Sequence, residues 1–247
     1  MKINDNGWSS RAWLEGDWLH RAPRRDDVRP RLLAEAQLLP WLAPQLPLPV
    51  PVPELTADGV RHRVLIGEPL EAGSTALGRE LGSFLKALHA VDPADALAHG
   101  AGDPEAGAAD KRRFLAEARD WILPLLPESG RAAGVELLDR VEGVRSALIH
   151  ADLGSDHLLV HDGRLTGIID WTDSEIGDPA LDLSWLLNDA PEGIAEGVAQ
   201  TYEVTPDLRR RALDWHRLAP WFTLHRGLLL DLQDDRDVGL AGVLARL

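Results

Sequence analysis

The sequence lacks several features, and each absence excludes a class of protein or site. It contains no cysteine, which excludes a disulfide framework, a zinc–thiolate site and a thiol nucleophile. No apolar run is long enough to span a bilayer, and the N-terminal residues MKINDNGWSS lack the apolar core of a signal peptide. Lysine is scarce, occurring only as Lys2, Lys86 and Lys111. We therefore expect a cytoplasmic protein with no membrane partner.

Positive charge is also in short supply relative to negative charge. The 247 residues hold 40 Asp and Glu against 26 Lys and Arg, for a formal net charge of −14. Such a surface repels nucleic acid, so we expect no nucleic-acid partner. It would attract a polycationic small molecule, although an acidic surface also simply confers solubility. The length suffices for one large domain or two lobes.

The part of the chain between residues 147 and 170 alternates short apolar runs with polar residues. Its apolar runs predict short strands at Ala147–Ile149, His157–Val160 and Leu165–Ile169. The last two flank an Asp-Gly turn within His161–Arg164, which is typical of a β-hairpin. Such a hairpin would hold Asp152, His157 and Asp170 close together despite their separation in sequence.

Those three residues have the chemistry that phosphoryl transfer requires. One carboxylate, Asp152, can take a proton, and Asp170 with His157 can hold a divalent cation. Taken singly, an Asp after a strand is more often a turn residue, and a lone His150 is more often a packed histidine. The ordered series H-x-D, His157, I-I-D and G-D-P-x-x-D-L makes a chance origin far less plausible.

This ordered series, from Leu148 to Leu187, resembles the catalytic loop and metal-binding Asp of the kinase fold. In detail it is similar to the aminoglycoside and macrolide phosphotransferases, most closely to the aminoglycoside 2″-phosphotransferases. The resemblance implies an α+β, bilobal protein-kinase-like fold. Residues 1–67 would form a small β-rich N-lobe, a nucleotide-binding sheet with one helix. Residues 68–247 would form a larger, mostly helical C-lobe with the catalytic loop and substrate pocket.

The resemblance also assigns roles within the catalytic loop. Asp152 would be the catalytic base and His150 would orient the loop. Asp170 and His157 would hold Mg²⁺ against the phosphates of ATP or GTP. Because magnesium prefers oxygen ligands, His157 could act directly, through a water, or only in support of the loop.

Nucleotide-binding residues are expected in the N-lobe. The polar loop Asn4–Arg11 could lay the Ser9 and Ser10 hydroxyls over phosphates. Arg21 occupies the position of the family's phosphate-gripping Lys, and Glu35, on a predicted helix, would anchor it. The alternatives are a basic surface cluster and an exposed helical Glu.

Further along, the sequence predicts how the two lobes join. A strand at Val60–Ile66 would lead to a hinge at Gly67, whose backbone would bond the purine of either nucleotide. The proline-rich run before it excludes a helix, and its alternating Leu and Val suggest packing. The Gly- and Ala-rich residues His99–Ala109 are expected to form a loop.

Substrate-binding residues are expected after the helix that begins at Asp178 and Pro179. By resemblance, acidic residues there would bind substrate amines, and aromatic residues would line the pocket. The candidates are Asp189, Glu192, Trp185 and Trp215. Capping or plain exposure of the acids, and core positions for the tryptophans, are the alternative readings.

We therefore expect a small-molecule O-phosphotransferase that moves the γ-phosphate of ATP or GTP to an aminoglycoside hydroxyl, as a monomer or weak dimer. One alternative keeps the chemistry and changes the acceptor to a macrolide, a sugar or an amino alcohol. The other is a catalytically idle nucleotide-binding protein of the same fold, consistent with Arg at position 21 and His at position 157. Fold resemblance alone does not decide between them.

Overall fold

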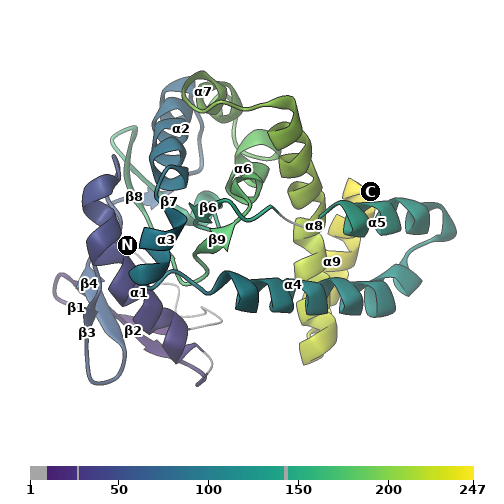
Figure 1. The fold of residues 1–247 in the computed structure, drawn as a ribbon, viewed down its shortest axis with the longest axis horizontal. Coiled ribbons are helices and arrows are strands. Elements are labelled where there is room, and N and C mark those ends of the chain that lie inside the picture. Colours follow the sequence, from purple (N-terminus) through teal and green to yellow (C-terminus); the bar gives the residue numbers. More distant parts are fainter. Residues whose placement is uncertain (1–9, 27, 142–143) are drawn as a thin grey trace.

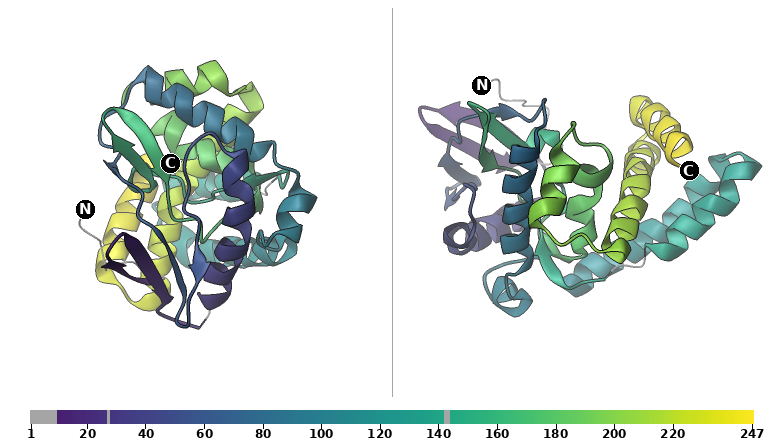
Figure 2. Two further views of the ribbon diagram at one scale, coloured as in Figure 1. Left: turned by 90° about the vertical axis from the view of Figure 1, so that its left-hand side faces the viewer. Right: turned by 90° about the horizontal axis from the view of Figure 1, so that it is seen from above.

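A computed structural model describes residues 10–26, 28–141 and 144–247. The chain has the expected α+β architecture, with a small lobe of strands and one helix beside a larger helical lobe (Figure 1). Seen from above, the small lobe lies at one side and the C-terminal helices at the other (Figure 2, right). The division at residues 67 and 68 stays a prediction.

The small lobe is an antiparallel sheet with a helix packed on it. Its strands lie in the order β1 (Ser10–Glu15), β2 (Trp18–Pro23), β4 (Val60–Arg63) and β3 (Glu54–Leu55). Helix α1 (Arg29–Leu42) buries Leu32 against Val28 and Val60. Gly16 lies in the turn between β1 and β2, with φ 59°. The strand expected to reach Ile66 ends at Arg63.

The proline-rich link packs against the large lobe, as its Leu and Val pattern predicted. Val50 is buried in the main core, and Leu48 packs against that core. The Pro49 carbonyl accepts a hydrogen bond from the Ile168 amide at 3.0 Å, which ties the link to the catalytic hairpin.

That hairpin is the predicted one. It consists of β7 (Leu158–His161) and β8 (Arg164–Ile168), with β5 (Glu68–Pro69) paired to β7 on its other side. Asp162 and Gly163 both have positive φ, 49° and 73°, which is the two-residue type I′ turn that an Asp-Gly pair favours.

A second, short strand pair lies beside the hairpin and carries the catalytic loop. Strand β6 (Ala147–Ile149) pairs with β9 (Glu175–Gly177). All three residues of β6 are buried.

The large lobe is built from helices around one apolar core. They are α2 (Thr75–His89), α3 (Pro93–Ala98), α4 (Pro104–Glu117), α5 (Glu128–Arg140), α6 (Pro179–Asn188), α7 (Ile194–Thr201), α8 (Pro206–Leu230) and α9 (Gln233–Arg246). Within the described part of the chain, no helix combines the length and the apolarity needed to cross a membrane.

The loop predicted at His99–Ala109 is wrong for its second half. Helix α4 already begins at Pro104, because Asp103 caps it and its carboxylate accepts a hydrogen bond from the Glu105 amide at 2.9 Å. An Asp-Pro pair is a helix-start signal. The Gly and Ala content of the segment concealed that signal.

The N-cap predicted at Asp178 is confirmed, since its carboxylate accepts from the Ala180 amide at 3.0 Å.

Helices α2 and α7 lie side by side at the top of the large lobe (Figure 1), and glycines set their separation. A Cβ on Gly197 would lie 2.2 Å from the Thr75 carbonyl oxygen. We expect Gly197→Ala to lower the free energy of unfolding by about 1–3 kcal/mol through overpacking, as measured by urea denaturation. In the matched control, Gly130→Ala on α5, the nearest atom lies 3.8 Å away, and stability should be unchanged or up to about 1 kcal/mol higher. Equal effects of the two changes would contradict this account of the helix contact.

Candidate active site

A buried carboxylate on α6 holds the catalytic loop in place. Both carboxylate oxygens of Asp182 accept backbone hydrogen bonds at 2.9 Å, one from His150 and one from Ala151. Ala151 has a positive φ of 69°, a strained conformation for a residue with a side chain. The two hydrogen bonds fix the backbone in this conformation just before Asp152.

Asp182 is in turn held by a histidine on α2. His89 Nε2 lies 3.1 Å from Asp182 Oδ2, and its Nδ1 lies 2.8 Å from the Tyr202 hydroxyl. Asp182 is fully buried, which opposes ionisation, but the His89 hydrogen bond and the backbone donor at His150 keep its pKa below the usual range. The loop anchor is therefore a charged acceptor with several donors.

The His150 ring is buried and forms hydrogen bonds that hold the catalytic loop. Its Nδ1 accepts a hydrogen bond from the Asp152 amide at 3.3 Å. The proton is therefore on Nε2, which donates to the Ile169 carbonyl at 2.9 Å. Burial lowers the pKa of His150, so the ring is neutral. This geometry suits the predicted orienting role.

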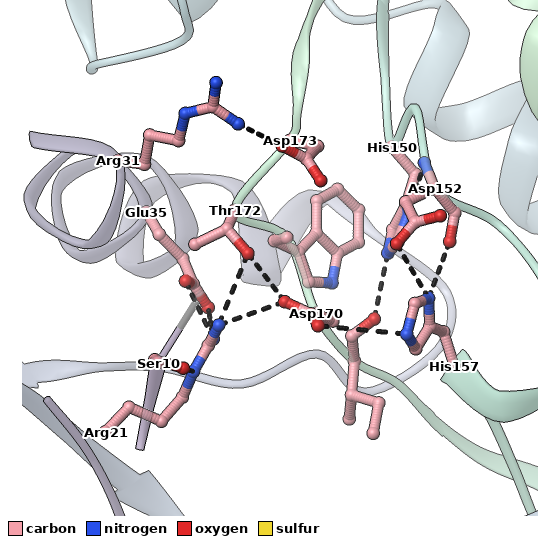
Figure 3. A network of polar contacts seen from close by, with 12 residues as sticks. Ser10, Arg21, Arg31, Glu35, His150, Asp152, His157, Asp170, Thr172 and Asp173 are labelled. Atoms are coloured by element: carbon pink, nitrogen blue, oxygen red, sulfur yellow. Dashed lines mark hydrogen bonds and ion pairs between the residues drawn. The ribbon is translucent and has the colours of Figure 1, made fainter. Parts of the chain in front are cut away.

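The three residues predicted to converge do so around His157 (Figure 3). His157 Nδ1 lies 3.6 Å from Asp152 Oδ2, and its Nε2 lies 3.8 Å from Asp170 Oδ2. Because Nδ1 also lies 2.6 Å from the Asp152 carbonyl, which can only accept, Nδ1 carries the proton. In the neutral ring the lone pair is then on Nε2, which faces Asp170. The Asp152 carboxylate is 58% exposed and open to a substrate.

The atoms that face one another between His157 and Asp170 fit a divalent cation bound together with a nucleotide. Asp170 presents a carboxylate oxygen and His157 its Nε2 nitrogen. In the described ranges, no three His, Asp or Glu side chains gather closely enough to hold a metal on their own. A magnesium ion typically keeps several waters and takes phosphate oxygens as well as one or two carboxylates, so such a partial set is suitable.

Arg21 joins the small lobe to this site. Its Nη1 donates to both oxygens of Glu35, at 3.0 and 2.9 Å, and its Nε donates to the Ser10 hydroxyl at 3.3 Å. Its Nη2 donates to Asp170 Oδ1 at 3.0 Å and to the Thr172 hydroxyl at 3.3 Å. All the N–H groups of the guanidinium are thus used by protein acceptors. The predicted Ser9 contact lies outside the described residues.

The charges around Arg21 are buried but compensated. Burial raises the pKa of Glu35 to about 7, against the opposing effect of the Arg21 guanidinium. Burial also opposes ionisation of Asp170, yet Arg21 and the Thr172 hydroxyl keep the pKa of that carboxyl below its usual range. Asp170 is therefore anionic at neutral pH, as a cation ligand must be.

Gly67, the predicted hinge residue, lies against the catalytic hairpin. It has φ 150°, and a Cβ there would lie 2.7 Å from the Thr166 hydroxyl and 2.9 Å from Leu159 Cβ. Only glycine allows the chain to pass this close to the hairpin. A contact with a purine stays a prediction.

A cavity of about 360 Å³ adjoins the catalytic loop at Ala151. It lies between α1, the start of α4 and the segment that follows Asp170. Five carboxylates line it, from Glu35, Asp103, Asp110, Asp173 and Glu175, and of these Glu35 is paired with Arg21. Arg31 also lines it and forms an ion pair with Asp173. Burial raises the pKa of both Asp173 and Glu175.

The sequence reading missed this acidic cavity. Asp173 and Glu175 were available as a signal, because they follow the metal-site Asp on the same loop. The contribution of α4 was not readable, since only the fold brings Asp103 and Asp110 next to that loop.

The predicted substrate residues lie elsewhere. Asp189 pairs with Arg246 at 3.1 Å, and Glu192 is exposed between α6 and α7. Trp185 is half-buried against the core, and Trp215 is buried with its N–H bonded to Asp178 at 3.1 Å. None of the four lines the cavity at Ala151. Their role in substrate binding stays a prediction.

The lobes, the H-x-D loop and the Asp at the lobe junction define a protein of the kinase-like fold. Residues 1–221 match the model of the phosphotransferase enzyme family, APH, and the chain belongs to that family. Among curated relatives, viomycin phosphotransferase from Streptomyces vinaceus is 33% identical over 116 residues, covering 44% of this chain and 40% of its own length. The protein YcbJ from Bacillus subtilis is 28% identical over 73% of this chain and 67% of its own length.

Solved structures match over nearly the whole chain. The macrolide 2′-phosphotransferase MphH from Brachybacterium faecium is 29% identical, with a TM-score of 0.77, covering 98% of this chain and 91% of its own. The GDP and kanamycin complex of APH(2″)-IIIa is 26% identical, with a TM-score of 0.83, covering 97% of this chain and 90% of its own. The expected family and fold are thereby confirmed.

The lowered pKa of Asp182 predicts a particular dependence of stability on pH. Its contribution is present above the ordinary value of 3.8 and is lost as the pH falls through the lower, folded-state pKa. We expect Asp182→Asn to be less stable than the parent by about 2 kcal/mol at neutral pH, because one acceptor becomes a donor facing backbone N–H groups. Denaturation in urea should show this gap narrowing as the pH falls below about 4. If the difference in stability between parent and variant stays constant across that range, Asp182 is not the charged acceptor that holds the loop.

Proposed function

We propose that this protein transfers the γ-phosphoryl group of ATP or GTP to a hydroxyl group of an amine-bearing antibiotic, with aminoglycosides as the first candidate class. The observation that carries the proposal is the convergence of Asp152, His157 and Asp170 at the junction of the lobes. Phosphoryl transfer depends on positioning and electrostatic stabilisation more than on covalent chemistry, and this arrangement supplies both.

In this proposal Asp152 acts on the acceptor. Its exposed carboxylate accepts a hydrogen bond from the acceptor hydroxyl and takes the proton as the new P–O bond forms. The bond between the γ-phosphorus and the β–γ bridging oxygen breaks in the same step and releases ADP or GDP. The loop backbone, held by Asp182 and His150, keeps the carboxylate in that position.

Asp170 and His157 act on the donor. The residues would hold Mg²⁺ through Asp170 Oδ2 and, directly or through a water, through His157 Nε2. When bound, the ion would neutralise negative charge on the nucleotide phosphates. Arg21 lies next to Asp170 and adds a fixed positive charge on the same side of the site.

The acidic cavity at Ala151 is the proposed acceptor pocket. Besides Glu35, which is paired with Arg21, four carboxylates and one arginine line it, so an acceptor with protonated amines would be attracted there. The cavity adjoins the residue that precedes Asp152, which would place an acceptor hydroxyl near the base.

The relatives support this class of acceptor. The named relatives include a viomycin phosphotransferase and a complex that contains GDP and kanamycin. A macrolide is the second candidate acceptor, because the match to the macrolide phosphotransferase MphH has the higher sequence identity of the two structures.

The base assignment predicts a selective loss of turnover. We expect Asp152→Asn to lower kcat by roughly a hundred- to ten-thousand-fold, because the hydroxyl proton loses its acceptor. Affinity for ADP with Mg²⁺, measured by calorimetry, should stay at the parent value. By contrast, Asp170→Ala should abolish the increase in ADP affinity that Mg²⁺ produces. Near-normal turnover in the Asp152 variant would remove the mechanism.

The acceptor pocket predicts which carboxylates set the KM for the amine-bearing substrate. We expect Asp173→Asn and Glu175→Gln each to raise the KM for kanamycin by roughly tenfold, as the loss of a charge-assisted hydrogen bond implies. The KM for the nucleotide should not change. Glu203→Gln, an exposed position between α7 and α8, is the charge-matched control and should leave both values unaltered.

Two further variants in the same assay locate the acceptor site. Asp189→Asn and Glu192→Gln remove the acids that the sequence favoured. If these changes raise the KM for kanamycin and the cavity variants do not, the acceptor binds at the end of α6 and the cavity proposal is wrong.

The function as a whole is tested by a screen of nucleotide consumption. Kanamycin, gentamicin, viomycin and erythromycin are offered in parallel with ATP and with GTP, each with Mg²⁺ and with EDTA. Antibiotic-dependent phosphate transfer is the expected result, and the antibiotic that is phosphorylated fastest identifies the acceptor class. Nucleotide binding without transfer to any acceptor, including sugars and amino alcohols, would favour the idle nucleotide-binding alternative.

A further inference from the structure

The Asp170 carboxylate is held at one oxygen and presented at the other (Figure 3). Its Oδ1 accepts from the Thr172 hydroxyl at 2.6 Å and from Arg21 Nη2 at 3.0 Å. The same Nη2 donates to the Thr172 hydroxyl at 3.3 Å, so the three side chains form a closed ring of hydrogen bonds. Oδ2 faces His157 on the opposite side.

The donors of Arg21 are fully used in this arrangement. Its remaining N–H groups bind Glu35 and Ser10, and the guanidinium is only 7% exposed. A direct bond from Arg21 to a phosphate would therefore break one of these buried hydrogen bonds. Loss of a buried hydrogen bond to a charged group is costly, so a role through Asp170 is favoured over direct contact with the nucleotide.

The backbone conformation of Asp170 explains why its carboxylate needs this ring of hydrogen bonds. Asp170 has φ 63°, in the left-handed region that few residues with side chains adopt. Without a restraint, the segment could relax and turn the carboxylate away. The Thr172 hydroxyl, two residues further on, bonds the carboxylate back onto its own segment and so opposes that rotation.

We propose that Thr172 and Arg21 are positioning residues for the metal-binding carboxylate. They hold Oδ1 of Asp170 so that Oδ2 is directed to the cation, and Arg21 acts through Asp170 rather than as a phosphate ligand. The inference rests on the proposed function, in which a magnesium nucleotide binds at Asp170 and His157.

The test compares ADP affinity by calorimetry in EDTA and in Mg²⁺. The ratio of the two affinities is the magnesium gain, and it measures how well Asp170 is presented to the cation. We expect Thr172→Val to lower the magnesium gain by about tenfold, the size expected for one hydrogen bond to a charged group, with metal-free ADP affinity unchanged. Thr172→Ser keeps the hydroxyl and should restore the gain.

A matched control removes a different threonine hydroxyl. Thr201 on α7 donates to the Arg79 carbonyl at 3.0 Å, far along the chain from Asp170. Thr201→Val makes the same chemical change and should leave the magnesium gain at the parent value. Circular dichroism on each variant monitors the fold.

Arg21→Lys separates positioning from direct phosphate contact. A lysine cannot bond all the acceptors of the guanidinium, so we expect the magnesium gain to fall while metal-free ADP affinity stays within about twofold. A parallel fall in metal-free affinity would identify Arg21 as a phosphate ligand and overturn its part of the proposal.

Failure of the inference is distinguishable from failure of the proposed function. If the parent protein binds ADP with a magnesium gain and Thr172→Val retains that gain, Thr172 has no positioning role and the inference falls alone. If the parent shows no ADP binding with or without Mg²⁺, the proposed function is wrong and the inference falls with it.

Discussion

The buried carboxylate of Asp182 is the constraint on which the site depends. It satisfies the backbone donors of His150 and Ala151, and Ala151 has the left-handed conformation that directs the chain to Asp152. An uncompensated charge at this depth would be strongly destabilising, so His89 and the backbone donors are required together. The strain at Ala151 is therefore sustained by backbone hydrogen bonds to a carboxylate on α6, a helix that does not line the cavity at Ala151.

A second set of contacts joins the small lobe to that loop. Arg21 from β2 and Arg31 from α1 both bond the segment after β8, at Asp170 and Asp173 respectively. Because these ion pairs connect residues about 140 positions apart or more in the chain, they depend on the arrangement of the lobes. The partly buried Arg21–Asp170 pair is screened less by solvent than the half-exposed Arg31–Asp173 pair, which contributes little to stability.

The sequence could predict the parts of the site that are set by local patterns. The hairpin was readable because an Asp-Gly pair between apolar runs specifies one turn type, and the H-x-D and I-I-D motifs place their residues at strand ends. The pairing of Arg21 with Glu35 was expected from the family pattern and is present. Thr172 was not readable, because a hydroxyl gains its role only from the rotamer of its neighbour. The acidic cavity was readable only in part, through Asp173 and Glu175. Likewise, Asp103 and Asp110 reach the site only through the packing of α4.

Burial divides the polar residues of this site into two groups with different physical tasks. Asp182, His150 and Arg21 are almost inaccessible and have their donors and acceptors satisfied within the protein, so they set geometry. Asp152 and Asp170 keep carboxylate oxygens accessible, and these are the groups with capacity for new partners. A preorganised site requires this division, because an exposed group is held in place only if its buried neighbours cannot move. The same division explains why the site can use arginine where the family has lysine. The rigid guanidinium of Arg21 donates hydrogen bonds to four separate side chains, which a single ammonium could not do.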